Sequence, residues 1–65
     1  MKVRVNGESR ELPEGRNVQE ALRDLQVTEH VAVALNMTCV THSQRAQTIL
    51  HEGDELEILS PMQGG

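Results

Sequence analysis

The chain contains no phenylalanine, tyrosine or tryptophan, and Cys39 is its single cysteine. A hydrophobic core must therefore come from aliphatic side chains, and no intrachain disulfide can brace it. A domain of this size buries only about 60% of the surface that its unfolded chain exposes. We therefore expect one small domain held by aliphatic packing, and the lone thiol favours a reducing, cytoplasmic location.

The charge balance argues against two classes of partner. Six basic and ten acidic residues give a net charge of −4, which repels nucleic-acid phosphates and anionic lipid surfaces. No apolar run approaches the roughly 20 residues needed to span a bilayer, and the N-terminus lacks the apolar stretch of a signal peptide. We expect no nucleic acid and no membrane as a partner.

The N-terminal segment has the pattern of a β-hairpin. Residues 1–5 alternate apolar and basic side chains, which is the period of a half-buried strand. Asn6 and Gly7 tolerate the positive φ angles of a type I′ turn. A second short strand is expected over residues 9–12, where Pro13 ends it.

A short helix is predicted from residue 18 to about Gln26. Asn17 precedes it as a candidate N-cap, and Glu20 stands three residues later, as in a capping box. Four apolar residues then follow the i, i+3, i+4, i+7 spacing of one helical face. They are Val18, Ala21, Leu22 and Leu25.

Two further strands are predicted in the second half of the chain. Residues 31–35 carry β-branched side chains at alternate positions, and residues 55–59 alternate strictly between acidic and apolar side chains. Between them we expect a turn at residues 36–37, a brief strand at 39–40 and one helical turn over 43–46, capped by Ser43.

Opposite charges indicate that the first and last strands are neighbours. Lys2 and Arg4 lie on the polar face of the first strand, and Glu55 and Glu57 lie on that of the last. Neighbouring strands would pair these charges favourably. One helix can cover only one face of the resulting sheet, which leaves the charged face open.

The sequence favours neither a metal site nor a Cys–His nucleophile. His30, Cys39, His42 and His51 are potential zinc ligands, but structural zinc sites normally show two closely spaced ligand pairs. We therefore expect no metal and no catalytic residue. The preferred interpretation has exposed histidines in loops and Cys39 as a small, partly buried core filler.

An acidic cluster surrounds the last strand, formed by Glu52, Asp54, Glu55 and Glu57. On composition alone a solvated face is favoured over a functional one. The alternative is a docking surface in which Glu55 and Glu57 steer the domain onto a basic partner. Leu59 falls on the same side of the strand as these two residues, so we expect it to be exposed beside the tail.

The segment Met62-Gln-Gly-Gly65 is the most informative part of the sequence. On this evidence alone, a frayed terminus is the favoured explanation. The chemical alternative makes the carboxylate of Gly65 a reactant, because glycine has no Cβ to block a narrow enzyme channel. Met62 would then supply an adaptable apolar contact.

The element order, the segment Val31-Ala-Val-Ala-Leu-Asn36 and the ending Ser60-Pro-Met-Gln-Gly-Gly65 resemble the ubiquitin-like sulfur carriers, and within them the carriers of thiamine biosynthesis. The resemblance spans the chain and implies an α+β fold, the β-grasp. This is a mixed four- to five-stranded sheet with one main helix packed on one face. It divides the chain into a β-grasp domain at residues 1–60 and a flexible tail at 61–65.

The resemblance also implies a mechanism. An E1-like adenylating enzyme would use ATP and Mg²⁺ to activate Gly65, and sulfur from a persulfide donor would then convert it to a thiocarboxylate. Thiazole synthase would accept the sulfur. Gly64 and Met62 would help the tail to enter both enzymes, and the carrier itself would bind no cofactor.

Departures from the family pattern leave other functions open. Relatives commonly have Asn-Gly at positions 36–37 and a tryptophan where this chain has Arg45. These differences concern the surface, so carriers for cysteine, tRNA-thiolation or molybdopterin pathways remain alternatives. A protein modifier that forms isopeptide bonds through Gly65 and a regulatory β-grasp binding module remain alternatives as well.

Overall fold

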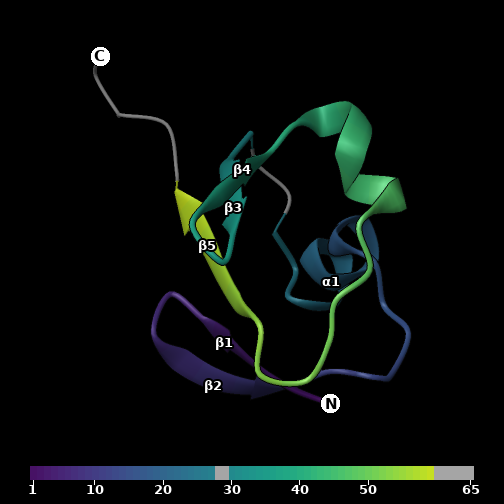
Figure 1. Cartoon of the computed structure of the whole chain (residues 1–65), viewed down its shortest axis with the longest axis vertical. Coiled ribbons are helices and arrows are strands. Elements are labelled where there is room, and N and C mark those ends of the chain that lie inside the picture. The colour runs from purple at the N-terminus through teal and green to yellow at the C-terminus, as the bar shows by residue number, and fades with distance from the viewer. Residues whose placement is uncertain (28–29, 60–65) are drawn as a thin grey trace.

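The computed structural model describes residues 1–27 and 30–59. A mixed sheet of five strands runs in the order β2-β1-β5-β3-β4, with β1 and β5 parallel and the other neighbours antiparallel (Figure 1). One α-helix packs against one face of this sheet. The elements are β1 (Lys2–Val5), β2 (Glu8–Glu11), α1 (Val18–Asp24), β3 (Ala32–Leu35), β4 (Thr38–Val40), the 3₁₀ helix η1 (His42–Gln47) and β5 (Glu55–Leu59).

The N-terminal hairpin is confirmed. Asn6 and Gly7 have φ angles of 51° and 85°, and Val5 pairs with Glu8 across this two-residue turn. The second strand covers Glu8–Glu11 and so begins one residue before its predicted start. Leu12 follows the strand and is buried in the core.

The capping box at the start of α1 is also confirmed. The Asn17 side chain accepts a hydrogen bond from the Glu20 amide at 2.7 Å, and the Asn17 amide donates to the Glu20 carboxylate at 3.0 Å. The helix ends at Asp24, two residues before its predicted end, and Gln26 has a φ angle of 61°. A left-handed residue at this point cannot continue the helix.

The segment after β4 differs from the prediction in its boundaries. It forms a 3₁₀ helix over His42–Gln47, and its cap is Thr41, not Ser43. The Thr41 amide donates to the side chain of Gln44 at 3.0 Å, and the Gln44 amide donates to the Thr41 carbonyl at 3.0 Å. The Gln44 side chain therefore caps the amide of Thr41 at the start of η1, in place of the cap expected at residue 43.

The core is aliphatic, as the composition requires. Its centre lies between α1 and the strands β1, β5 and β3, where Leu56 of β5 is completely buried. The buried residues of the described chain are Val3, Leu12, Val18, Ala21, Leu22, Val33, Val40, Leu50 and Leu56. Neither helix of the described chain is long and apolar enough to cross a membrane.

The predicted neighbourhood of the first and last strands is confirmed, since Arg4 of β1 is in register with Glu55 of β5. The charged side chains nevertheless form no ion pair. Within residues 1–27 and 30–59, no salt bridge joins Lys2 or Arg4 to either glutamate of β5. Exposed charges on neighbouring strands remain hydrated, so leaving them unpaired changes the stability of the fold very little.

We predict that Met37→Gly stabilises the domain. Met37 holds a φ angle of 70° in the β3–β4 turn and is 93% exposed. It therefore bears the strain of a left-handed residue without any compensating burial, and its replacement should raise the free energy of unfolding by about 1 kcal/mol in urea denaturation.

The converse substitution is the control. Gly7→Met places the same side chain at the equivalent position of the first hairpin, where φ is 85°. It should lower the free energy of unfolding by a similar amount. A Met37→Gly variant that is less stable than the parent would contradict this account.

Candidate functional site

The outer face of β5 carries the three side chains predicted to meet a partner. Leu56 and Ile58 point towards α1, so Glu55, Glu57 and Leu59 point to the open face of the sheet. Leu59 is 60% exposed, which confirms the expected exposure. Because β5 is the central strand, these side chains lie in the middle of that face.

Small apolar residues surround Leu59 on the same face. Ala32 of β3 is in register with Leu59, and Ala34 is in register with Glu57 on one side and Cys39 of β4 on the other. Residues in register across a sheet point to the same face. We call Leu59, Ala32, Ala34 and Cys39 the apolar patch. The patch projects little from the sheet, because three of its four side chains are very small.

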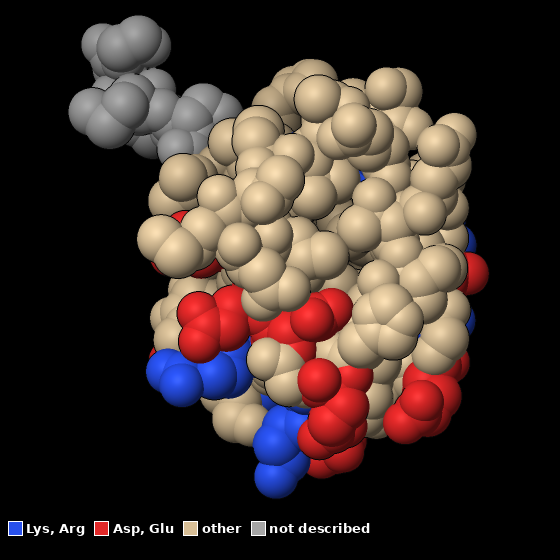
Figure 2. All heavy atoms as spheres, viewed as in Figure 1, with Lys and Arg blue, Asp and Glu red and all other residues tan. Residues whose placement is uncertain are grey.

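The charged residues occupy the other half of the open face. Lys2 and Arg4 of β1 lie there beside Glu55 at the start of β5. Figure 2 shows acidic and basic side chains gathered over the half of the molecule that holds β1 and β2, while the opposite half is almost uncharged in this view. The open face therefore combines an apolar contact area with an adjoining charged area.

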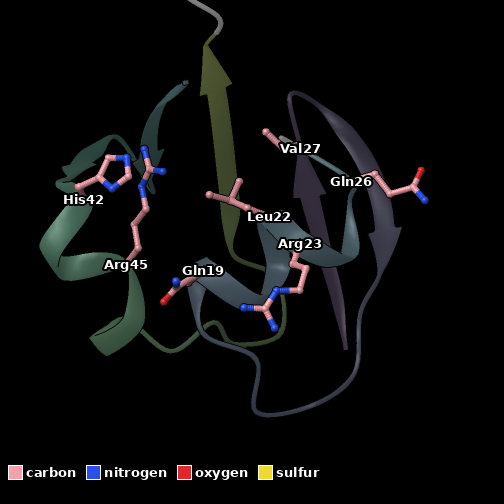
Figure 3. A pocket seen from close by; sticks show the side chains of 7 residues that line it. All are labelled: Gln19, Leu22, Arg23, Gln26, Val27, His42 and Arg45. Atoms are coloured by element: carbon pink, nitrogen blue, oxygen red, sulfur yellow. The ribbon is translucent and has the colours of Figure 1, made fainter. Parts of the chain in front are cut away.

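A separate cavity of about 300 Å³ lies between α1 and η1 (Figure 3). Arg45 reaches across one side of it and donates from Nη2 to the Val31 carbonyl at 2.7 Å. Its Nε is buried and has no hydrogen-bond partner among the described residues. The lining residues are Gln19, Leu22, Arg23, Gln26, Val27, His42 and Arg45. None of these is a nucleophile such as serine or cysteine.

The potential metal ligands are dispersed. The rings of His30 and His42 lie 6.4 Å apart between centroids, and His51 belongs to the turn before β5. In the described part of the chain, no three histidine, cysteine or acidic side chains are grouped closely enough to hold a metal ion.

The burial of the cysteine was predicted wrongly. Cys39 is exposed, because it lies opposite Ala34 on the open face of β4, whereas its neighbour Val40 points into the core. The three histidines are exposed, as expected. The alternation of a three-residue strand was too brief to decide which of its residues faces inward.

The three predicted tail residues, Met62, Gly64 and Gly65, lie outside the described residues. Sequence inspection missed the contribution of Ala32 and Ala34 to the open face. Their alternation with valine gave the signal for their orientation, but only the strand order places them beside Leu59.

Comparisons with known proteins agree on one family. The model of the ThiS family matches residues 3–65. The crystal structure of a thiamine biosynthesis protein (ThiS) from Geobacter metallireducens is 33% identical, each chain covers all of the other, and the TM-score is 0.88. A solution structure of a thiamine biosynthesis protein from the same organism is 35% identical over this whole chain and 88% of its own, with a TM-score of 0.83.

A thiazole synthase from Paramagnetospirillum magneticum is also similar. It is 38% identical over 66 residues, which cover the whole of this chain but 20% of the relative. The chain thus spans about a fifth of the length of this curated relative.

We predict that the thiol of Cys39 reacts completely with a thiol reagent in the folded protein. Its exposure on the open face leaves nothing to protect it. The reaction rate, followed by absorbance at constant pH, should change less than about threefold when the protein is unfolded in urea. Strong protection in the native state would show that this part of the open face is covered.

Proposed function

Because the chain belongs to the ThiS family of small sulfur carrier proteins, we propose that it carries sulfur on its C-terminal glycine, Gly65, for thiamine biosynthesis. The match of the family over residues 3–65 carries this proposal, since it includes both glycines of the tail. The protein is a substrate of other enzymes and is not itself an enzyme.

The proposed chemistry begins with activation of the Gly65 carboxylate, which is a poor electrophile. An E1-like adenylating enzyme of the ThiF type would join it to the α-phosphate of ATP, with release of pyrophosphate. ATP and Mg²⁺ belong to that enzyme. The terminal sulfur of a persulfide donor would then displace AMP and form an acyl disulfide between Gly65 and the donor. A second thiol would attack the donor's sulfur in this disulfide, form a new disulfide with the donor and release the thiocarboxylate on Gly65. The missing Cβ atoms of Gly64 and Gly65 allow the close approach that both steps require.

A thiazole synthase of the ThiG type is the proposed acceptor of the sulfur. The similarity of this chain to part of a protein named thiazole synthase supports that choice. Two proteins that act in succession gain in effective concentration when their domains are linked, so a carrier-like segment within a synthase is chemically reasonable.

The apolar patch is proposed as the surface that both enzymes recognise. Leu59 is the last described residue before the tail, so an enzyme that contacts it lies close to the reactive end. Its exposed side chain provides a site for apolar burial, and the adjoining Glu55 and Glu57 would steer the domain towards a basic surface. Met62 would extend this contact into the tail.

The central test is mass spectrometry of the protein after incubation with ATP, Mg²⁺, a persulfide donor, a reducing thiol and a ThiF-type enzyme. Replacement of oxygen by sulfur should raise the mass by about 16 Da. A variant that lacks Gly65 should remain unchanged. An unmodified parent chain with an enzyme that is active on another carrier would contradict the proposal, and adducts on lysines of other proteins would indicate a protein modifier instead.

Leu59→Ala should weaken recognition without weakening the fold. Loss of an exposed side chain changes the free energy of unfolding by less than about 0.5 kcal/mol. Loss of an interface contact worth about 1.4 kcal/mol raises the KM for the carrier about tenfold. The measurement is the initial rate of pyrophosphate release at varied carrier concentration.

Met37→Ala is the matched control, because Met37 is also exposed but lies in the turn at the other end of β3. Its KM should stay within about twofold of the parent value. Equal effects of the two substitutions would argue against the apolar patch as the recognised surface.

A further inference from the structure

The side chain of Asn6 holds the C-terminal part of β5. The Ile58 amide donates to Oδ1 of Asn6 at 2.8 Å, and Nδ2 of Asn6 donates to the Ile58 carbonyl at 3.1 Å. Asn6 belongs to the β1–β2 turn, far from Ile58 in the sequence. One amide group therefore satisfies both backbone groups of a single residue in the last strand.

These two bonds continue a ladder that the backbone of β1 cannot complete. The Arg4 amide donates to the Asp54 carbonyl at 2.9 Å, and the Asn6 amide donates to the Leu56 carbonyl at 3.0 Å. The next two rungs of a parallel ladder would join the Ile58 amide to the backbone carbonyl of Asn6 and the Ile58 carbonyl to the amide of Glu8, but the hairpin turns away at Asn6 and Gly7. A carboxamide has the donor and acceptor of a peptide group, so the Asn6 side chain replaces the missing strand.

The opposite edge of β5 is held by β3. Ala32 is in register with Leu59, and Val33 is in register with Ile58. The end of β5 is thus held on both edges, and on the β1 edge the Asn6 side chain supplies the bonds to Ile58. This is the point from which the chain continues towards Gly65.

We propose that Asn6 is a positioning residue for the sulfur transfer: its side-chain amide fixes the end of β5, the point from which the chain continues to Gly65, before an enzyme binds. The inference rests on the proposed function. A strand end that is already ordered before binding lowers the conformational entropy lost when an enzyme takes up the chain that follows it. Asn6 touches neither ATP nor the reacting carboxylate in this scheme, so its effect is indirect.

Asn36 offers a closely matched comparison. It occupies the β3–β4 turn with a φ angle of 50° and also binds β5 through its side chain. Its Oδ1 accepts from the Glu55 amide at 2.9 Å, and its Nδ2 donates to Asp54 at 3.1 Å. Asn36 therefore holds the beginning of β5, and Asn6 holds its end.

The first experiment compares Asn6→Gly with Asn36→Gly by amide hydrogen exchange in NMR spectra. Glycine keeps the positive φ of each turn and removes only the side-chain bonds. In Asn6→Gly, the Ile58 amide should exchange about tenfold faster or more relative to the core amides, and in Asn36→Gly it should not. An Ile58 amide that remains protected in Asn6→Gly would overturn the inference, whatever the function of the protein.

The second experiment measures pyrophosphate release with the activating enzyme at varied carrier concentration. Asn6→Gly should raise KM about fivefold and leave kcat unchanged. The enzyme must then order the end of β5 when it binds the carrier, and this cost weakens binding but does not affect the bound complex. Asn36→Gly should change KM by less than about twofold. Asn6→Asp retains the acceptor for the Ile58 amide, so it should recover part of the loss.

The outcomes separate the two proposals. Equal KM values for the two glycine variants, in proteins that are both fully folded, would overturn the positioning role. If the parent chain releases no pyrophosphate, the proposed function fails, while the exchange rate of the Ile58 amide still decides whether Asn6 orders the end of β5.

Discussion

The position of β5 between β1 and β3 is the constraint on which the other features depend. Leu56 is in register with Val5 on one side and Leu35 on the other, and it is completely buried beneath α1. A slip of one residue would turn Leu56 outward and bring Glu55 or Glu57 into the aliphatic core, where an unpaired carboxylate loses its hydration. The fold and the outward direction of Leu59 are therefore set by the same register.

Local signals predicted most of the elements, and long-range contacts account for what was missed. The pair Asn6-Gly7 fixes a hairpin and Asn17 with Glu20 fixes a helix start, because each involves neighbours in the sequence. The strand order beside β5 and the side-chain bonds of Asn6 and Asn36 join distant segments, so no local pattern reports them. The exposure of Cys39 also depends on the pairing of β4 with β3.

The two faces of the sheet differ in burial and composition. The face under α1 contains the buried aliphatic side chains and gives the domain its stability. The open face holds the apolar patch and the charged residues of β1 and β5, which contribute little to stability and are free to serve recognition. The proposed recognition therefore uses the face of the sheet that contributes no side chain to the core.

The parallel pairing of β1 with β5 also affects biosynthesis. These strands come from opposite ends of the described chain, so the central rungs of the sheet close late and over a long loop. During translation the first hairpin and α1 are made well before their central partner leaves the ribosome. The apolar patch, which includes Leu59, is complete only once β5 has paired with β3, so an enzyme that requires it would distinguish finished domains from incomplete ones.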